Sequence, residues 1–351
     1  MRWKEGNMIK KVAIISLSRG LLGEDFVKHE VEIGVRRLKE CGLEVVTTKN
    51  ALKGMDFIAK HPELRANDLL DALNDGSIDM IISAIGGDDT YRLLPFLFEN
   101  DELKNTVRNS KKIFLGYSDT TMNHFMFYKA GLNTFYGQSF LPDVCELEKE
   151  MLPYSKSYFE ELINTKTIKS ITPSKIWYTE RENFTPSQIN VKRIQHQNKG
   201  FELLQGNPVF RGKILGGCIE TIYDIFDNTR YSDSVVLCKK YKLFPSLEEW
   251  KGKILLLESS EEQTKPELYI KMIQTLQATG IFNVINGILV GKPFNEIYYE
   301  EYKNILIAEV QNKDLPIVYN VNIGHSTPKC IIPFGINAEV NVDKQVIQFI
   351  G

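Results

Sequence analysis

The stretch KKIFLGYSDTTMNHFMFYKAG, residues 111–131, passes directly from a short apolar run into a longer amphipathic segment. A short apolar run followed by helical spacing is typical of one strand-to-helix step in an open α/β sheet. Ser118 stands at the turn between the two parts. The stretch therefore predicts a strand that turns sharply into a helix, with a hydroxyl group at the turn.

The same alternation is repeated on the N-terminal side of this stretch. Strands are expected at Val12–Ile15, Met80–Ile85 and Lys112–Leu115, and helices at Glu24–Cys41 and Leu64–Leu73. Gly42 follows the first of these helices, where a glycine commonly ends a helix. Alternating strands and helices predict a doubly wound parallel sheet, which we assign to a first domain over residues 8–164.

The second half of the chain has a different pattern. Strands are expected at Lys213–Leu215, Lys253–Leu257, Gly287–Val290 and Pro316–Ile323, and one helix at Pro266–Ala278. Thr264 and Gly280 are the start and stop signals of that helix, and Ile331–Gly351 alternates apolar and polar residues like antiparallel strands. This pattern predicts a mixed α+β domain over residues 213–351. The polar segment before it, residues 165–212, is expected to form a linker and a long substrate loop.

Length and composition fit a two-domain globular protein that acts on small molecules. A chain of 351 residues exceeds the size at which single cores stop growing, about 250–300 residues. Its 43% hydrophobic and 25% charged residues allow a sizeable core in each half. A net charge of −2 gives no electrostatic footprint for a nucleic acid polymer or an anionic membrane, so we expect a small partner.

The cysteines and the N-terminus indicate the compartment. The five cysteines include no C-x-x-C pair and have no neighbouring histidine at metal spacing, so we expect a reducing compartment and no metal site. The N-terminal sequence MRWKEGNMIKK is polar and leads into VAIIS, which is too short for a secretory or membrane-spanning segment. These features predict a cytoplasmic protein in which residues 1–7 form a leader outside the fold.

Several of the expected strands stop abruptly at small or polar residues. These ends lie at Ser16, Gly86, Ser118, Glu258 and the pair Gly324–His325. In open α/β sheets, ligands bind beyond the carboxyl ends of the strands. We therefore expect these five ends to share one cleft.

Ser118 is the candidate nucleophile. A sharp strand-to-helix turn would lift its hydroxyl into the cleft and leave the next backbone amide, that of Asp119, free as an oxyanion donor. The alternative is that Ser118 only caps the following helix. The motif also departs from G-x-S-x-G, since Thr120 stands where the second glycine would be.

The tandem glycines Gly86–Gly87, which precede Asp88, are a second candidate element. Glycine lets a backbone amide approach a ligand without a Cβ in the way, although an ordinary tight turn is the alternative interpretation. Neither this loop nor Ser18–Gly23 matches G-x-G-x-x-G or a Walker A sequence. The sequence therefore gives no support for a dinucleotide or P-loop site, and we expect no cofactor.

His325 and Glu258 are the candidate partners of the serine. His325 ends a strand among small residues, and an imidazole is the usual base for a serine hydroxyl. Glu258 closes the very apolar run KILLL, where its carboxylate could hold the imidazole in the required tautomer. A structural histidine and a solvated strand end are the alternatives.

Six ordered motifs carry a resemblance to a known family. They are SAIGGDDTYRLLPFL, IFLGYSDTTMNHF, KILGGCIETI, KILLLESSEE, INGILVGKP and PIVYNVNIGHSTPKCIIPFG, spread from Val12 to Gly335. The set resembles the LD-carboxypeptidase family of serine peptidases, within it the branch of the microcin C self-immunity proteins. The resemblance implies a Rossmann-like parallel-sheet N-terminal domain, a smaller β-rich α+β C-terminal domain, a cleft between them, no metal and a homodimer.

The resemblance also implies roles for particular residues. It implies a catalytic triad of Ser118, Glu258 and His325, with oxyanion donors at Gly87 and Asp119. Cys218 is a departure, because family members usually have asparagine after the two glycines at this position.

The IGGDD loop, with Gly86 and Asp88, and an insertion that contains Trp177 look like the microcin branch. Substrates of that branch are aminoacyl nucleotides, on whose base Trp177 could stack. The alternative for Trp177 is that it pins the loop to the body of the protein.

Three functions are therefore weighed. The favoured one is a serine hydrolase that cleaves aminoacyl or peptidyl nucleotides. The second is a muramoyl-tetrapeptide LD-carboxypeptidase, which shares the chemistry and differs in the pocket. The third is a non-catalytic module that binds a small ligand at the strand ends, and such a module has no reason to place Glu258 and His325 opposite Ser118.

Overall fold

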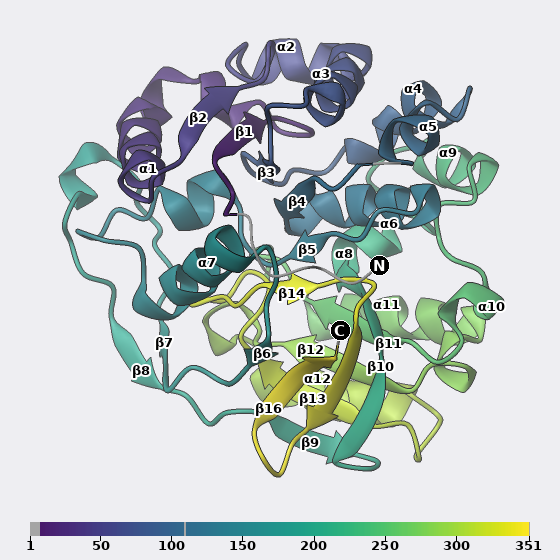
Figure 1. The fold of residues 1–351 in the computed structure, drawn as a ribbon. Helices are drawn as coiled ribbons and strands as arrows, with labels where there is room; N and C mark the ends of the chain where they lie inside the picture. Colours follow the sequence, from purple (N-terminus) through teal and green to yellow (C-terminus); the bar gives the residue numbers. More distant parts are fainter. Residues whose placement is uncertain (1–7, 109, 351) are drawn as a thin grey trace.

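The computed structural model describes residues 8–108 and 110–350, so the expected leader at residues 1–7 lies outside the described residues. Two sheets form the core, one in each half of the molecule (Figure 1). No helix of the described chain is long and apolar enough to cross a membrane.

The first sheet has six strands in the order β14-β5-β4-β3-β1-β2. Their bounds are β1 Lys11–Ile15, β2 Glu44–Thr47, β3 Met80–Ser83, β4 Ile113–Gly116, β5 Phe135–Tyr136 and β14 Ile332–Pro333. Strands β2, β1, β3, β4 and β5 pair in parallel, whereas β14 comes from the C-terminal part of the chain and pairs antiparallel with β5. Strands β3 and β4 are buried along their whole length, which explains their continuous apolar runs.

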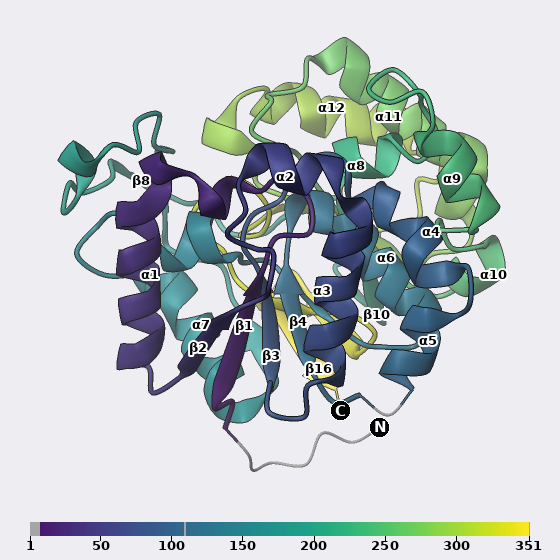
Figure 2. The ribbon, with the colours of Figure 1, turned by 90° about the horizontal axis from the view of Figure 1, so that it is seen from above.

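Helices connect and cover these strands. They are α1 Lys28–Glu40, α2 Met55–Lys60, α3 Pro62–Asn74, α4 Leu94–Phe98, α5 Glu102–Val107, α6 Thr121–Ala130 and α7 Pro153–Thr165. Figure 2 shows β2, β1, β3 and β4 side by side, with α1 next to β2 and α3 along the sheet. Helix α1 is followed by Gly42 at a φ of 82°, as expected for a glycine that ends a helix.

The predicted start of the first helix was wrong. Residues 21–27 form two short 3₁₀ turns, and α1 begins only at Lys28. Glu24 lies between the turns in an extended conformation, because its carboxylate accepts a hydrogen bond of 2.7 Å from the backbone amide of Met55. Gly23 also contacts that neighbouring loop, since a Cβ at this position would lie 2.3 Å from the Gly54 nitrogen. A tertiary contact therefore overrides the helical spacing.

The second sheet has eight strands in the order β6-β16-β15-β10-β11-β12-β13-β9. Their bounds are β6 Ser170–Ile171, β9 Glu202–Gln205, β10 Val209–Cys218, β11 Ile254–Glu258, β12 Gly287–Gly291, β13 Ile317–Val321, β15 Asn337–Asn341 and β16 Val346–Ile350. The central strands β10 to β13 are parallel, and the flanking strands pair antiparallel. The α/β fold class, with a parallel-sheet first half and a mixed, β-rich second half, is confirmed.

The segment 165–212 contains more regular structure than a linker and loop. Besides β6, β9 and the start of β10, it forms a two-stranded ribbon of β7 Ile176–Tyr178 and β8 Gln195–Gln197. These strands are mostly two to four residues long, too short for an alternating pattern to stand out in the sequence. The domain boundaries at residues 164 and 212 stay a prediction.

Five helices accompany the second sheet: α8 Ile219–Tyr223, α9 Ser234–Lys240, α10 Leu247–Trp250, α11 Pro266–Thr279 and α12 Tyr299–Glu309. Gly280 ends α11 at a φ of 82°, as predicted. Thr264 does not cap this helix, because its hydroxyl donates a 2.7 Å hydrogen bond to the Glu220 carboxylate and Lys265 occupies the N-cap position.

Candidate active site

Ser118 occupies a strained turn between β4 and α6. Its φ is 67°, in the left-handed region that residues with a side chain rarely adopt. The residue follows Gly116 and Tyr117 and opens a single 3₁₀ turn that leads into the helix. In the described part of the chain, the hydrogen bond of its hydroxyl is with His325, and the cap positions of the turn and the helix are Tyr117 and Thr120. The turn instead aims the hydroxyl at a histidine on the other half of the molecule.

That histidine is His325, which lies just beyond β13. Its Nε2 is 3.0 Å from Ser118 Oγ, and its Nδ1 is 2.7 Å from Oε2 of Glu258 at the end of β11. Glu258 is 1% exposed and His325 is 8% exposed. The structure therefore brings the three predicted residues together in one hydrogen-bonded chain that crosses from the first sheet to the second.

A glycine lets the histidine segment come this close to Glu258. Gly324 has a φ of 90°, and a Cβ on it would lie 2.4 Å from Glu258 Oε2. Any side chain at residue 324 would thus collide with the carboxylate and also strain the backbone. The Gly-His sequence at the strand end is a requirement of this packing.

Tyr136 is a residue of the site that the sequence reasoning missed. Its hydroxyl donates a 2.6 Å hydrogen bond to Glu258 Oε1 and accepts one of 3.2 Å from the Ser118 amide. Burial raises the pKa of Tyr136 well above its ordinary value, so the hydroxyl keeps its proton at neutral pH. The only signal in the sequence is that Tyr136 ends β5 just before Gly137, which is another strand end.

The electrostatic surroundings favour a charged imidazole. Burial alone would lower the pKa of His325, but the carboxylates of Glu258 and Glu261 raise it to about 9. Glu261 lies on the loop after β11, and its Oε2 is 3.1 Å from His325 Nε2. The Tyr117 ring packs edge-on against the imidazole at a centroid distance of 5.0 Å.

The glycine loop lies against the serine. A Cβ on Gly86 would be 2.7 Å from Ser118 Oγ, and Gly87 has a φ of 151°. Within the described chain, the amides of Gly87 and Asp119 donate to no protein acceptor. The Asp119 carboxylate is buried and holds the amide and hydroxyl of Thr90 at 3.0 and 2.6 Å. The two predicted oxyanion donors therefore adjoin, in the chain, the residues that meet here, since Gly87 follows Gly86 and Asp119 follows Ser118.

A cleft of about 380 Å³ opens over these groups. Gly86, Gly87, Asp88, Ser118 and His325 all line it. Its cationic lining consists of Arg19, Arg181, Arg193, Arg230 and Lys329. Among the described residues, each of these except Arg19 has a carboxylate partner within 4 Å. Arg19 is exposed, and its backbone amide donates to the carbonyl of Gly86. The guanidinium without a carboxylate partner is therefore carried by a loop that is hydrogen-bonded to the glycine loop.

Trp177 does not line this cleft. It is 7% exposed and stacks on His196 at a centroid distance of 4.2 Å, with Lys292 Nζ 5.0 Å from its ring. This packing favours the alternative in which Trp177 pins the loop. Phe184, seven residues further along, lines the cleft and is 48% exposed. Sequence patterns show aromatic residues but not which of two neighbours packs inward, so a role for Trp177 in substrate stacking stays a prediction, and Phe184 is the aromatic residue of this pair that lines the cleft.

Cys218 lies at the end of β10, close to Glu258 and His325. Its thiol is 3.2 Å from Glu220 Oε2, and burial raises its pKa well above the ordinary value. Among the described residues, the one group with atoms close enough to hold a metal ion is Cys218, Glu258 and His325, whose ligand atoms lie within 4.8 Å of one another. The facing atoms of Glu258 and His325 are already joined by their hydrogen bond. The sequence could not reveal this cluster, because its members come from three distant strand ends.

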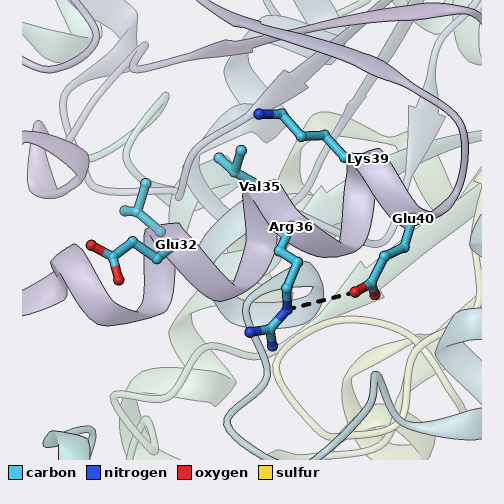
Figure 3. Close-up of a pocket in the computed structure, with 6 residues that line it drawn as sticks. Glu32, Val35, Arg36, Lys39 and Glu40 are labelled. Atoms are coloured by element: carbon cyan, nitrogen blue, oxygen red, sulfur yellow. Dashed lines mark ion pairs between the residues drawn. The ribbon is translucent and has the colours of Figure 1, made fainter.

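A separate hollow runs along the outer face of α1 (Figure 3). Its six lining residues all belong to that helix, and its one ion pair joins Arg36 to Glu40 at 3.7 Å. It offers no group from a second element, so it does not compete with the cleft as a site.

Comparison with known proteins gives consistent matches along the chain. The model of the LD-carboxypeptidase N-terminal domain matches residues 12–137, and that of the C-terminal domain matches residues 211–340. An MccF-like protein from Streptococcus pneumoniae, solved in complex with AMP, is 58% identical with a TM-score of 0.96, covering 98% of this chain and 99% of that one.

Two curated relatives are more distant. The microcin C7 self-immunity protein MccF of Escherichia coli is 24% identical, over 90% of this chain and 86% of the relative. The probable murein peptide carboxypeptidase of Bacillus subtilis is 23% identical, over 87% of this chain and 82% of the relative.

Proposed function

We propose that this chain, which belongs to the LD-carboxypeptidase family, hydrolyses small aminoacyl or peptidyl nucleotides with Ser118 as nucleophile, His325 as base and Glu258 as its partner. Membership of the family makes the chain a serine peptidase related to carboxypeptidases. The observation that carries the triad is the hydrogen-bonded chain from Ser118 Oγ through His325 to Glu258.

In the first step, His325 Nε2 accepts the hydroxyl proton while Ser118 Oγ forms a bond to the scissile carbonyl carbon. Glu258 stabilises the resulting imidazolium through Nδ1 and keeps the ring in position. The imidazolium then donates its proton to the leaving nitrogen as the C–N bond breaks. Water, deprotonated by the same imidazole, hydrolyses the acyl-enzyme and regenerates Ser118.

The carbonyl oxygen becomes negatively charged in the tetrahedral intermediate. We assign its stabilisation to the amides of Gly87 and Asp119, which have no protein acceptor among the described residues. Asp119 directly follows Ser118, and Gly87 directly follows Gly86, the glycine that touches Ser118. Donors of this kind contribute about 2.7–4 kcal/mol each in known hydrolases. The Tyr136 hydroxyl accepts from the Ser118 amide and so helps to position the nucleophile and the Asp119 amide that follows it.

A nucleotide leaving group is favoured by two features of the cleft. Exposed Phe184 offers an aromatic face for a base, and the free guanidinium of Arg19 offers a partner for an anionic linker. The AMP complex of the 58% identical protein supports nucleotide binding on the same scaffold. Gly86 and Asp88 line the same cleft and are assigned to substrate contact.

Cleavage of a muramoyl tetrapeptide before its terminal D-alanine remains the second candidate. It is favoured by the likeness to a probable murein peptide carboxypeptidase, and Arg19 would equally suit the carboxylate of a leaving amino acid.

The deciding experiment measures kcat/KM of the purified protein for an aminoacyl sulfamoyl adenosine and for a muropeptide tetrapeptide. We expect release of the amino acid and of sulfamoyl adenosine, with little release of D-alanine. Hydrolysis of the muropeptide alone would replace the nucleotide proposal by the cell-wall one. Binding of both without hydrolysis of either would favour a non-catalytic module.

A further inference from the structure

Glu261 contacts the group that is assigned the role of base. Its carboxylate oxygen lies 3.1 Å from His325 Nε2, while Ser118 Oγ lies 3.0 Å from the same nitrogen. Two oxygen atoms therefore compete for one nitrogen, and only one of them belongs to the nucleophile.

This contact requires a proton on Nε2. When Nδ1 donates to Glu258, a neutral imidazole has only a lone pair at Nε2, and a lone pair repels a carboxylate. The contact is favourable with an imidazolium, in agreement with the raised pKa of His325. An imidazolium cannot accept the proton of Ser118, so Glu261 must leave Nε2 before the reaction starts.

The surroundings of Glu261 allow it to leave. Its side chain is 60% exposed and, among the described residues, its one charged partner is His325. Glu258, by contrast, is fully buried and held by Tyr136. The neighbouring Glu262 is already paired with Arg230 at 2.7 Å. Among the carboxylates that line the cleft, Glu261 is thus the one that contacts His325 and is exposed enough for an incoming cation to bind it.

We propose that Glu261 binds the α-ammonium group of the acyl half of the substrate, and that this ammonium draws Glu261 away from His325 and so frees the base. The proposal rests on the proposed function and adds that a free α-amino group beside the scissile carbonyl is both recognised and used to start the reaction.

The distances fit an amino group at the α position. The scissile carbon must lie about 3–3.5 Å from the attacking oxygen, here Ser118 Oγ, and the α-nitrogen is two bonds from that carbon. Oε2 of Glu261 lies 3.1 Å from His325 Nε2, so this carboxylate is within reach of an α-nitrogen placed beside the imidazole. When Glu261 pairs with the ammonium, the Nε2 proton passes to water in the open cleft. The freed nitrogen then accepts the Ser118 proton.

Other charged groups near His325 stay in place during this exchange. Glu258 faces Nδ1, and the buried Lys329 lowers the tendency of the imidazole to hold a proton. Lys329 is paired with Asp143 at 2.9 Å and also donates to the Tyr117 hydroxyl. The Cys218 sulfur lies within 4.8 Å of a ring nitrogen of His325, and burial raises the pKa of this thiol, so it stays uncharged. Of these groups, Glu261 is the exposed one, so its departure is what changes the charge on the imidazole.

The test uses three sulfamoyl adenosine conjugates that differ only in the acyl group: alanyl, propionyl, which lacks the amine, and 6-aminohexanoyl, whose amine is distant. The wild-type enzyme should prefer alanyl to propionyl by about tenfold or more in kcat/KM, as one charge-assisted hydrogen bond provides. Glu261→Gln should remove most of this preference, and the 6-aminohexanoyl conjugate should not restore it. Glu262→Gln is the matched control on the same loop and should keep the preference.

The pH profile gives a second readout that a purely structural role would not move. With the propionyl conjugate, which has no amine to titrate, the acid limb of kcat/KM reports the free enzyme. Glu261→Gln should move that limb to lower pH, because it removes one of the charges that raise the pKa of His325. Equal rates for alanyl and propionyl in the wild type, or a preference unchanged in Glu261→Gln, would overturn the inference and leave the hydrolase proposal intact. No hydrolysis of any conjugate would count against the hydrolase itself.

Discussion

The strand ends and the segment 165–212 both face the cleft, yet they differ in how they are built. At the strand ends, Ser118, His325 and Glu258 are joined by hydrogen bonds and supported by buried strands. In the segment 165–212, Trp177 is buried against His196 whereas Phe184 is exposed at the cleft. The candidate triad is thus held by the buried strands, whereas the aromatic surface that the segment 165–212 offers to the cleft depends on which side chains its short strands leave uncovered.

The largest expected effect on activity is that of replacing Ser118, the candidate nucleophile at the strand ends. Ser118→Ala should leave the fold intact and lower kcat by at least about four orders of magnitude, as loss of a triad nucleophile does in known enzymes. The measurement is single-turnover hydrolysis of the preferred substrate, with thermal unfolding as the control for folding.

Ser118→Ala combined with His325→Ala should be no worse than either change alone, because the two groups act as a unit. Activity of Ser118→Ala within tenfold of wild type would mean that the strand ends bind substrate without cleaving it.

The next effect concerns Tyr136, which links the nucleophile to Glu258. Tyr136→Phe should lower kcat by about tenfold to a hundredfold, since it leaves a buried Glu258 oxygen without its donor, a loss of about 1–3 kcal/mol. Tyr319→Phe is the matched control, because that buried hydroxyl of β13 donates to the backbone carbonyl of Tyr299, the first residue of α12. If both variants lose stability equally and activity equally, Tyr136 has no special part in the site.

The sequence made Ser118 and Glu258 stand out for a physical reason, whereas the expected strand end at Ser16 is buried, donates to the Ala51 carbonyl and does not line the cleft. A buried strand must be apolar, so Ser118 and Glu258 are conspicuous where they end such runs, and parallel strands bring their carboxyl ends to one edge. Tyr136 ends a strand of only two residues, and Glu261 lies in a loop beside other acidic residues, so neither stood out. The contact of Tyr136 with Glu258 exists only after the two halves have come together, and the contact of Glu261 with His325 joins the ends of two separate strands of the second sheet.

The segment 165–212 was less predictable because its pattern is weak. Trp177 and Phe184 have similar surroundings in the sequence, and the ribbon of β7 and β8 decides which of them is covered. Trp177 stacks on His196, which is 19 positions away in the sequence. No local periodicity of the sequence predicts such a contact.

A pair of alanine substitutions separates the two aromatic residues. Phe184→Ala should lower kcat/KM for a nucleotide substrate by about tenfold to a hundredfold, from a base stack of about 1–3 kcal/mol, and should leave the Tm unchanged. Trp177→Ala should lower the free energy of unfolding by about 3 kcal/mol through lost packing and change kcat/KM less. The reverse outcome, with Trp177→Ala acting on kcat/KM alone, would restore Trp177 as the base-stacking residue.

The smallest expected effect is that of Cys218→Ala, which tests whether every polar residue at a strand end takes part in the chemistry. Cys218 ends β10 close to Glu258 and His325, but it is 2% exposed and its thiol faces Glu220. A cysteine nucleophile acts as a thiolate, whereas burial raises the pKa of Cys218 well above its ordinary value and keeps the thiol protonated. We therefore expect kcat/KM within about threefold of wild type and a loss of about 1 kcal/mol in the free energy of unfolding, from a small cavity in the core.

The measurements are steady-state kinetics and urea unfolding of the two proteins side by side, together with inactivation by a thiol reagent, which should be slow in the native wild type. Loss of activity in Cys218→Ala with unchanged stability would mean that the thiol supports Glu258 or His325 directly. Cys218 would then be a residue of the site and not only a packing residue.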